Sequence, residues 1–274
     1  MHRRLAELDR LDRTYGLGTM PTGSNRRRAR RDHGAFWPSM LVTLVVLVAV
    51  LALTPGVSAY RIRALVGLGD QRLRDVVTTR HGQGQFRFTN TQPGSREPVS
   101  YNPCRPIHYV VNPAGAPADY LSLVEQAVTE VARATGFEFE YDGTTGDRDF
   151  ENRGGLSVRS TPVLIGWATP EEVPGLAGDI AGLGGSAYVE RTPDHRTYVT
   201  GMVALDTEVF ARLSSQPGGF EALRAIVMHE LGHVVGLAHV QDPSELMYDD
   251  NLGRTSFGPG DLEGLARLGA VDCL

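Results

Sequence analysis

Apolar and polar residues follow two different periods in the second half of the chain. A helix is predicted from Asp119 to Thr135, because the apolar residues Leu121, Val124, Val128 and Val131 recur at helical spacing. Gly136 would end this helix. Further helices are predicted at about 220–236 and 260–269. Short apolar or alternating runs predict five strands, at 107–111, 137–141, 163–168, 186–190 and 198–205. Strands and helices are therefore mixed, and most strands precede the second helix.

The first 60 residues have a different pattern. Residues 1–33 are polar and rich in arginine, whereas residues 34–60 contain no charged residue. An uncharged run of this length, with Trp37 and Tyr60 near its ends, can span a bilayer. We predict a transmembrane signal anchor at 34–60, with the basic tail 1–33 in the cytoplasm. The alternative is a signal peptide that is cleaved near Ala59 and releases a secreted protein.

Both interpretations place residues 61–274 outside the cytoplasm, with 61–83 as a stalk and 84–274 as the folded domain. Residues 1–83 contain 14 arginines against 6 acidic residues, and residues 84–274 contain 13 arginines against 26 acidic residues. A nucleic-acid-binding protein needs its positive charge on the folded surface, so this acidic domain is not expected to bind nucleic acid. The basic tail instead suits the cytoplasmic side of a membrane.

The chemistry is concentrated in residues 229–239, which read HELGHVVGLAH. His229 and His233 are four residues apart and therefore share one face of the predicted helix. Glu230 is displaced around the helix, where it would reach a metal-bound water and not the metal. Gly236 can adopt a positive φ and end the helix sharply, which would bring His239 back as a third ligand. Three neutral imidazoles and a water form an open, catalytic zinc site.

This motif, followed by Met247 within DPSELMY at 242–248, resembles the metzincin zinc proteases and in particular their matrixin branch. The resemblance implies an α+β catalytic domain. It has a twisted, mostly parallel five-stranded sheet with three helices, and the transmembrane helix would precede it. The resemblance also implies one catalytic zinc ion bound by His229, His233 and His239, with Glu230 as the general base. Met247 would form an apolar floor beneath the zinc and would not bind it.

The resemblance further implies how a peptide or protein substrate would bind. Matrixin-like domains have an edge strand above the cleft that pairs with an extended substrate, and residues 184–189 occupy the corresponding place in this sequence. The expected substrate-binding residues are Gly184, Gly185, Ser186, Ala187 and Tyr248. The implied activity is that of a zinc metalloendopeptidase.

The chain has two cysteines, Cys104 and Cys273, near the two ends of the predicted domain. Two isolated cysteines do not make a cysteine-based zinc site, but outside the cell they suit one disulfide that clamps the ends of the domain. One alternative is a pair of unrelated buried thiols. Another is a latency switch at Cys104, although the Pro-Arg-Cys-Gly context of matrixin propeptides is absent.

The sequence gives little support for further metal sites. Matrixins carry a second, structural zinc, but only His195 lies in the relevant region, so that site is not predicted. Asp179, Asp194 and Asp206 are scattered acids without a recognisable calcium loop, so structural calcium is not predicted either. The rival functions are a catalytically silent, zinc-stabilised surface domain that binds a partner, and a zinc hydrolase that acts on a non-peptide amide.

Overall fold

The computed structural model describes residues 43, 46, 71–153, 161–250 and 253–273. The chain divides into two compact units, Met1–Val50 and Leu51–Leu274, and the second contains all the elements described below. Of the predicted anchor at 34–60, only Thr43 and Val46 are described, and both are helical; the rest lies outside the described residues. Within the described part of the chain, no helix is both long enough and apolar enough to cross a membrane.

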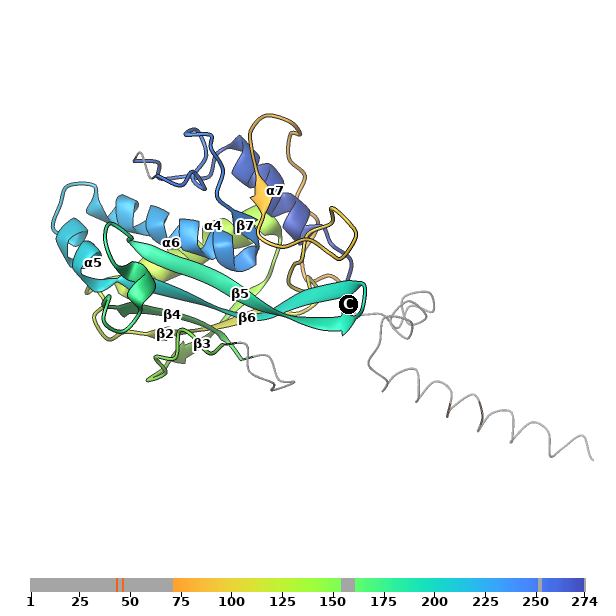
Figure 1. Ribbon diagram of the computed structural model, residues 1–274, viewed down its shortest axis with the longest axis horizontal. Helices are drawn as coiled ribbons and strands as arrows, with labels where there is room; N and C mark the ends of the chain where they lie inside the picture. Colours follow the sequence, from red (N-terminus) through yellow and green to blue (C-terminus); the bar gives the residue numbers. More distant parts are fainter. Residues whose placement is uncertain (1–42, 44–45, 47–70, 154–160, 251–252, 274) are drawn as a thin grey trace, which may run out of the picture. The chain divides into compact units, whose positions relative to one another are not determined.

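A five-stranded sheet forms the base of the domain, in the order β3-β2-β4-β6-β5 (Figure 1). Its strands are β2 (Ile107–Asn112), β3 (Phe139–Thr144), β4 (Val163–Ala168), β5 (Gly182–Thr192) and β6 (His195–Asp206). The pairs β2–β3, β2–β4 and β4–β6 are parallel, and only β5 runs antiparallel to its neighbour β6. The predicted mostly parallel five-stranded sheet is therefore confirmed, and β5 is an edge strand.

Strand β5 is much longer than the predicted strand at 186–190. It begins at Gly182 and runs through Gly184 and Gly185. Glycine has no side chain to produce an alternating pattern and is depleted in strands, so the sequence pattern hid this part of β5. The missing part is the portion that lies beside the candidate site described below.

The three predicted helices are present as α4 (Tyr120–Thr135), α6 (Gly219–Val235) and α7 (Pro259–Gly269). The prediction of only three was wrong, because α5 (Thr207–Ser214) follows β6 directly. Its first turn is capped by Asp206, whose side chain accepts a hydrogen bond from the Val209 N–H at 2.7 Å. Phe210 is its one buried residue, so α5 lacks the long apolar stripe that made the other helices recognisable.

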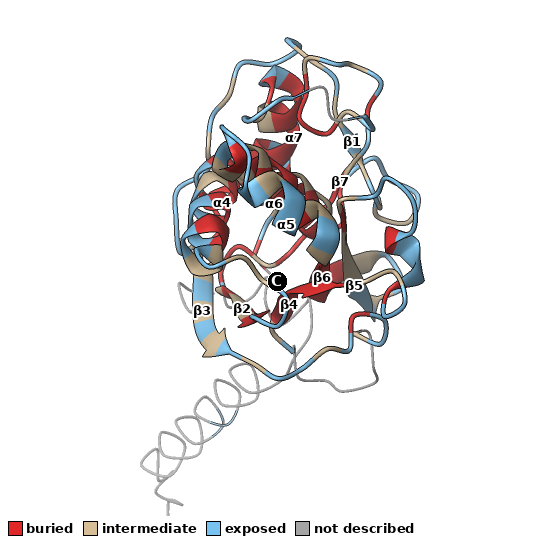
Figure 2. Cartoon of the chain, turned by 90° about the vertical axis from the view of Figure 1, so that its left-hand side faces the viewer, coloured by how far each residue is buried: buried red, intermediate tan, exposed pale blue. Residues whose placement is uncertain are grey.

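Helices α4 and α6 pack on one face of the sheet and enclose the main core (Figures 1 and 2). Strand β4 is buried along its whole length, as expected for a central parallel strand covered on both faces. Trp167 on β4 packs edge-on against Tyr120 of α4 and Phe210 of α5. Helix α4 ends at Gly136, which has φ 75°. This core holds α6, the helix with the histidine motif, against the sheet.

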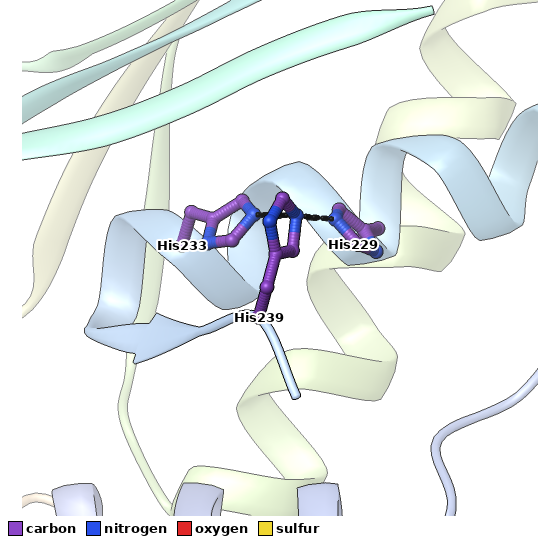
Figure 3. Close-up of side chains that lie close together, drawn as sticks. All are labelled: His229, His233 and His239. Atoms are coloured by element: carbon purple, nitrogen blue, oxygen red, sulfur yellow. Dashed lines mark hydrogen bonds between the residues drawn. The ribbon is translucent and has the colours of Figure 1, made fainter. Parts of the chain in front are cut away.

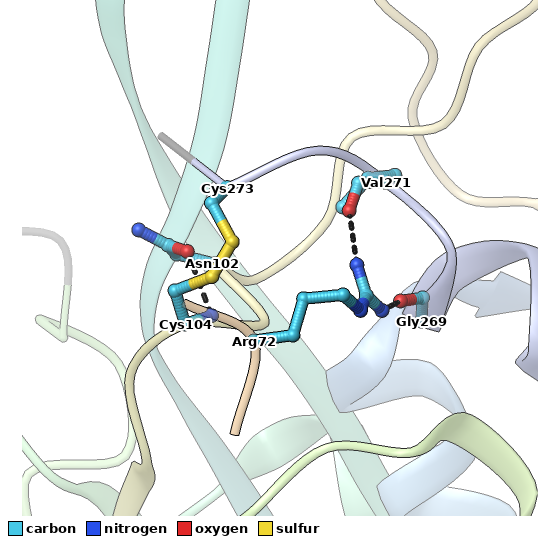
Figure 4. Close-up of a disulfide and its surroundings, with 6 residues drawn as sticks. All are labelled: Arg72, Asn102, Cys104, Gly269, Val271 and Cys273. Carbon is cyan, nitrogen blue, oxygen red and sulfur yellow. Dashed lines mark hydrogen bonds between the residues drawn. A yellow bond between two sulfur atoms is a disulfide. The ribbon is translucent and has the colours of Figure 1, made fainter. Parts of the chain in front are cut away.

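The two ends of the domain are joined covalently (Figure 4). Cys104 and Cys273 form a disulfide with a Cα–Cα distance of 5.5 Å, which confirms the predicted pairing. Beside it, the Arg72 guanidinium donates hydrogen bonds to the carbonyls of Val271, at 2.7 Å, and Gly269. In the chain-entropy model, closing so long a loop stabilises the fold by about 5 kcal/mol.

The described part of the predicted stalk lies against the domain. The Leu73 N–H donates to the Pro103 carbonyl at 3.3 Å, and the Gly82 N–H donates to the Glu263 carboxylate on α7 at 2.7 Å. The chain then forms β1 (Arg87–Phe88), which pairs with β7 (Leu237–Ala238). This small second sheet was not predicted, because two residues are too few to show a period. It connects the N-terminal end of the domain to the histidine motif.

Candidate metal and catalytic site

Helix α6 and the turn after it bring the three histidines of the motif together (Figure 3). His229 and His233 lie one turn apart on α6. The helix ends at Gly236, which has φ 123° and donates its N–H to the carbonyls of Gly232 and His233. The chain then reverses through β7 and delivers His239. This is the sharp exit that the sequence predicted from Gly236.

The Nε2 atoms of the three imidazoles converge on one point. Nε2 of His239 lies 3.0 Å from Nε2 of His229 and 3.0 Å from Nε2 of His233, and the last two are 3.2 Å apart. Tetrahedral zinc with Zn–N bonds of about 2.0–2.1 Å separates its nitrogen ligands by about 3.3–3.4 Å. The observed triangle is close to that size, so the three residues fit a metal ion.

Hydrogen bonds to the backbone fix which ring nitrogen faces the centre. Nδ1 of His229 donates to the Leu246 carbonyl at 2.7 Å, and Nδ1 of His233 donates to the Leu237 carbonyl at 2.8 Å. A carbonyl can only accept, so each Nδ1 carries the proton and each Nε2 presents a lone pair. The two Nε2 lone pairs face one another and repel unless a cation lies between them. A bound metal ion would remove this repulsion.

Burial keeps these imidazoles neutral. It lowers the pKa of His229 to about 3, with a further contribution from His233, and the pKa of His233 to about 4. The pKa of His239 is also lowered, first by burial; the charge of Asp249 raises it, and the charge of Arg87 lowers it. Neutral imidazole is the form that binds metals.

We expect zinc to stay bound as the pH is lowered from 7.5 to about 5, because protons do not compete for imidazoles whose pKa lies well below the usual value of about 6.5. Zinc per chain, measured after equilibrium dialysis at each pH against a fixed free zinc concentration, tests this. Loss of half of the zinc near pH 6.5 would contradict it.

Glu230 is buried on α6, with 6% of its surface exposed, and it faces the start of β5. Burial raises the pKa of its carboxyl to about 8, although the Gly184 N–H donates to it and acts in the opposite direction. A Cβ at Gly182 would lie 2.8 Å from Cγ of Glu230, and one at Gly184 would overlap the Glu230 backbone carbonyl. The two glycines therefore allow β5 to approach the helix closely at Glu230.

Met247, the residue expected to lie beneath the zinc, is buried against helix α6. It is 1% exposed, and a Cβ at Gly232 would lie 2.6 Å from its Sδ. The loop that carries it is held by Asp261 at the start of α7, whose carboxylate accepts the N–H groups of Leu246, at 2.5 Å, and Met247, at 3.4 Å. The Leu246 carbonyl accepts the hydrogen bond from Nδ1 of His229. Asp261 therefore supports His229, a candidate ligand, through Leu246.

Glu245 completes this support, and sequence reasoning missed both acids. Its carboxylate accepts the N–H groups of Gly260 and Asp261, each at 2.9 Å. Burial is the largest influence on Asp261 and raises its pKa to about 7. The only sequence signal is that an acid in the Met247 loop and an acid in the first turn of the next helix are close along the chain. Two acids at such a spacing are common in sequences, and the spacing does not show that each carboxylate accepts N–H groups from the other acid's segment.

Thr89, also missed, supports a second candidate ligand. Its hydroxyl donates to the Leu237 carbonyl at 2.8 Å, the same oxygen that accepts the His233 proton. Its backbone N–H donates to the Gly236 carbonyl at 2.9 Å. Thr89 lies far before the motif in the sequence, so no local pattern links the two.

We expect Thr89→Val to weaken zinc binding about tenfold, at the lower end of what outer partners of metal ligands contribute. Thr89→Ser should retain wild-type affinity because it keeps the hydroxyl. Competition with a chromophoric chelator measures both. Equal affinities for the valine and serine variants would show that the hydroxyl does not position His233.

The expected substrate-binding residues lie on or near the edge of the sheet. Gly184 to Ala187 belong to β5, whose outer edge has no partner strand among the described residues. The side chain of Ser186 is turned inward, since its hydroxyl donates to the Val234 carbonyl on α6 at 2.7 Å. Only its backbone is thus available at the edge. Tyr248 is half-buried and bridges to Val240 beside the histidine turn.

A second group that could hold a metal lies on β2 and β3, at His108, Glu140 and Asp142. Nδ1 of His108 lies 2.9 Å from Asp142, whereas its Nε2 lies 3.8 Å from Glu140. Each ring nitrogen thus faces a different carboxylate on an exposed surface, which is the arrangement of ion pairs and not of a chelate.

Comparison with known proteins agrees with this geometry. Residues 168–258, which include β5, β6, α6 and the Met247 loop, match the family model described as Matrixin. The chain carries a matrixin-like domain. None of the curated proteins matches the chain. The matrixin match covers all the candidate ligands, Glu230 and Met247, and matrixins belong to the zinc metallopeptidases.

Two solved structures are similar to part of this chain at low identity. Archaemetzincin from Methanopyrus kandleri is 16% identical, with 59% of this chain and 93% of that chain covered at a TM-score of 0.40. The GM1-bound form of the ECX AB5 holotoxin is 14% identical, with 60% and 79% covered at a TM-score of 0.34. At these TM-scores neither likeness adds to the family match and the site geometry.

Proposed function

We propose that this chain is a zinc-dependent endopeptidase that hydrolyses peptide bonds of extracytoplasmic proteins. The observation that carries the proposal is the convergence of three Nε2 atoms within 3.2 Å of one another. Two of these rings are fixed by their Nδ1 protons. The buried carboxyl of Glu230 follows His229 directly on the same helix. A purely structural zinc site needs four ligands and no base, and the motif offers three ligands and an acid.

When bound, zinc supplies a Lewis acid that lowers the pKa of a water molecule and polarises the scissile carbonyl. Glu230 takes the proton of the attacking water and delivers it to the leaving amine. The apolar surroundings that raise its pKa also suit it to hold that proton between the two steps. The substrate backbone pairs with the outer edge of β5, as an added antiparallel or parallel strand.

The proposed location is the outer side of a membrane, with residues 34–60 as the anchor and the catalytic domain outside the cytoplasm. The Cys104–Cys273 disulfide supports an oxidising compartment, because disulfides persist there and are rare in the cytosol. Cleavage near Ala59, with release of the domain, remains the alternative. N-terminal sequencing of the protein from membrane and medium fractions distinguishes the two.

The test uses the purified full-length chain in mild detergent. Zinc per chain is measured, together with cleavage of casein before and after treatment with a chelator and after zinc is restored. One zinc per chain with cleavage that is lost and regained supports the peptidase. Zinc without cleavage of casein or of a diverse peptide mixture would favour a catalytically silent surface domain. Absence of zinc would remove the proposal.

A further inference from the structure

Strand β1 places Arg87 beside the third histidine of the site. Figure 2 shows β1 beside β7, and in this antiparallel pair Arg87 is opposite Ala238, the residue before His239. Opposed Cα atoms in such a pair lie about 4.5–5.5 Å apart, and an extended arginine side chain is longer than that. The Arg87 side chain is also close enough to His239 for its charge to lower the pKa of that imidazole, after the larger effect of burial.

The Arg87 side chain points away from the core. Successive residues of a strand face opposite sides, and Phe88 packs against the core opposite the buried Leu237. Arg87 consequently faces outward with Ala238, a small residue that leaves the guanidinium uncovered. Arg87 is exposed, in agreement with this alternation.

Within the part of the chain that the structure describes, Arg87 has no hydrogen-bond or ion-pair partner. Neighbouring arginines around the site are engaged: Arg267 with Glu263 and the Phe86 ring, Arg254 with the Pro243 carbonyl, and Arg224 with the Thr255 carbonyl. In the Met247 loop, Asp249 accepts a hydrogen bond from Gln241 at 2.9 Å. Among the described residues, no hydrogen bond or ion pair therefore occupies the Arg87 guanidinium, and its donors are available to a ligand.

We propose that Arg87 is a specificity-determining residue that binds an acidic side chain of the substrate close to the scissile bond. The planar guanidinium can donate two parallel hydrogen bonds to a carboxylate, and it does so better than lysine. This inference rests on the proposed peptidase function and names its substrate class: peptides with Asp or Glu beside the bond that is cleaved. In a domain with twice as many acids as arginines, the surroundings would otherwise disfavour such peptides.

The test separates binding from cleavage. Zinc-loaded full-length Glu230→Gln protein is titrated with fluorescent peptides that carry one Asp at a scanned position, each beside a twin with Asn. We expect at least one Asp peptide to bind about fivefold more tightly than its twin, the upper range for an exposed ion pair. Adding Arg87→Gln should remove the preference, and adding Arg87→Glu should reverse it toward a Lys peptide.

Arg133→Gln is the matched control, because it makes the same charge change on the exposed face of α4 and should keep the preference. Zinc content is measured for each variant, so that metal loss is not mistaken for lost specificity. No Asp preference at any position, or a preference that Arg87→Gln leaves unchanged, overturns the role of Arg87. An Arg87-dependent preference without cleavage by the wild type would keep that role and overturn the peptidase function.

Discussion

The Glu230→Gln variant is expected to lose at least about a thousandfold in kcat, the range that a general base contributes, while it binds zinc as the wild type does. Glutamine keeps the shape of the side chain and can still accept the Gly184 N–H, but it cannot take a proton. Hydrolysis of a fluorogenic peptide, with zinc per chain measured on the same sample, gives both quantities. His233→Ala is the companion variant and should lose zinc and activity together.

The same variant is expected to be at least as stable as the wild type in the metal-free state at pH 8. The pKa of Glu230 is about 8 in the fold, against an ordinary value of 4.5. The folded state therefore binds more protons than the unfolded state between these values, and the free energy of unfolding falls as the pH rises through that window. Glutamine has no such dependence. Thermal unfolding of both proteins at pH 5 and pH 8 measures this difference in stability. For the activity, a Glu230→Gln variant that keeps a tenth of the wild-type kcat would exclude Glu230 as the general base.

Gly184→Ala is expected to destabilise the domain by about 3 kcal/mol and to reduce peptidase activity at least about tenfold. The new Cβ would overlap the carbonyl oxygen, carbonyl carbon and Cα of Glu230, all of them backbone atoms that cannot rotate away. Either β5 or α6 must shift, and both carry groups of the proposed site. Chemical denaturation and the kinetics of the zinc-loaded protein measure the two effects.

Gly185→Ala is the matched control for stability. It makes the same substitution in the next residue of β5, where nothing lies within 4 Å of an added Cβ. Its free energy of unfolding should change by less than about 1 kcal/mol. Equal losses in the two variants would show that backbone entropy in β5, and not the close approach to Glu230, explains the effect.

The local part of the site was predictable from sequence. The spacing of His229 and His233 is a property of one helix, and the positive φ at Gly236 is a property of one residue. The pairing of Cys104 with Cys273 followed because the chain has no other cysteine. The parallel sheet and the edge strand followed from resemblance to the matrixins, which rests on the motif and Met247.

The sequence by itself therefore determined which residues converge and the general fold around them. Only the tertiary structure decided what holds them in place: the carbonyls of Leu237 and Leu246, supported by Thr89 and by the Asp261–Glu245 pair. It also decided that β5 approaches Glu230 through glycines, and that Arg87, which has no hydrogen-bond or ion-pair partner among the described residues, lies opposite Ala238. The physical reason is that helical periodicity and turn preference are local, whereas these hydrogen bonds and close approaches join segments far apart in the chain and leave no repeating pattern.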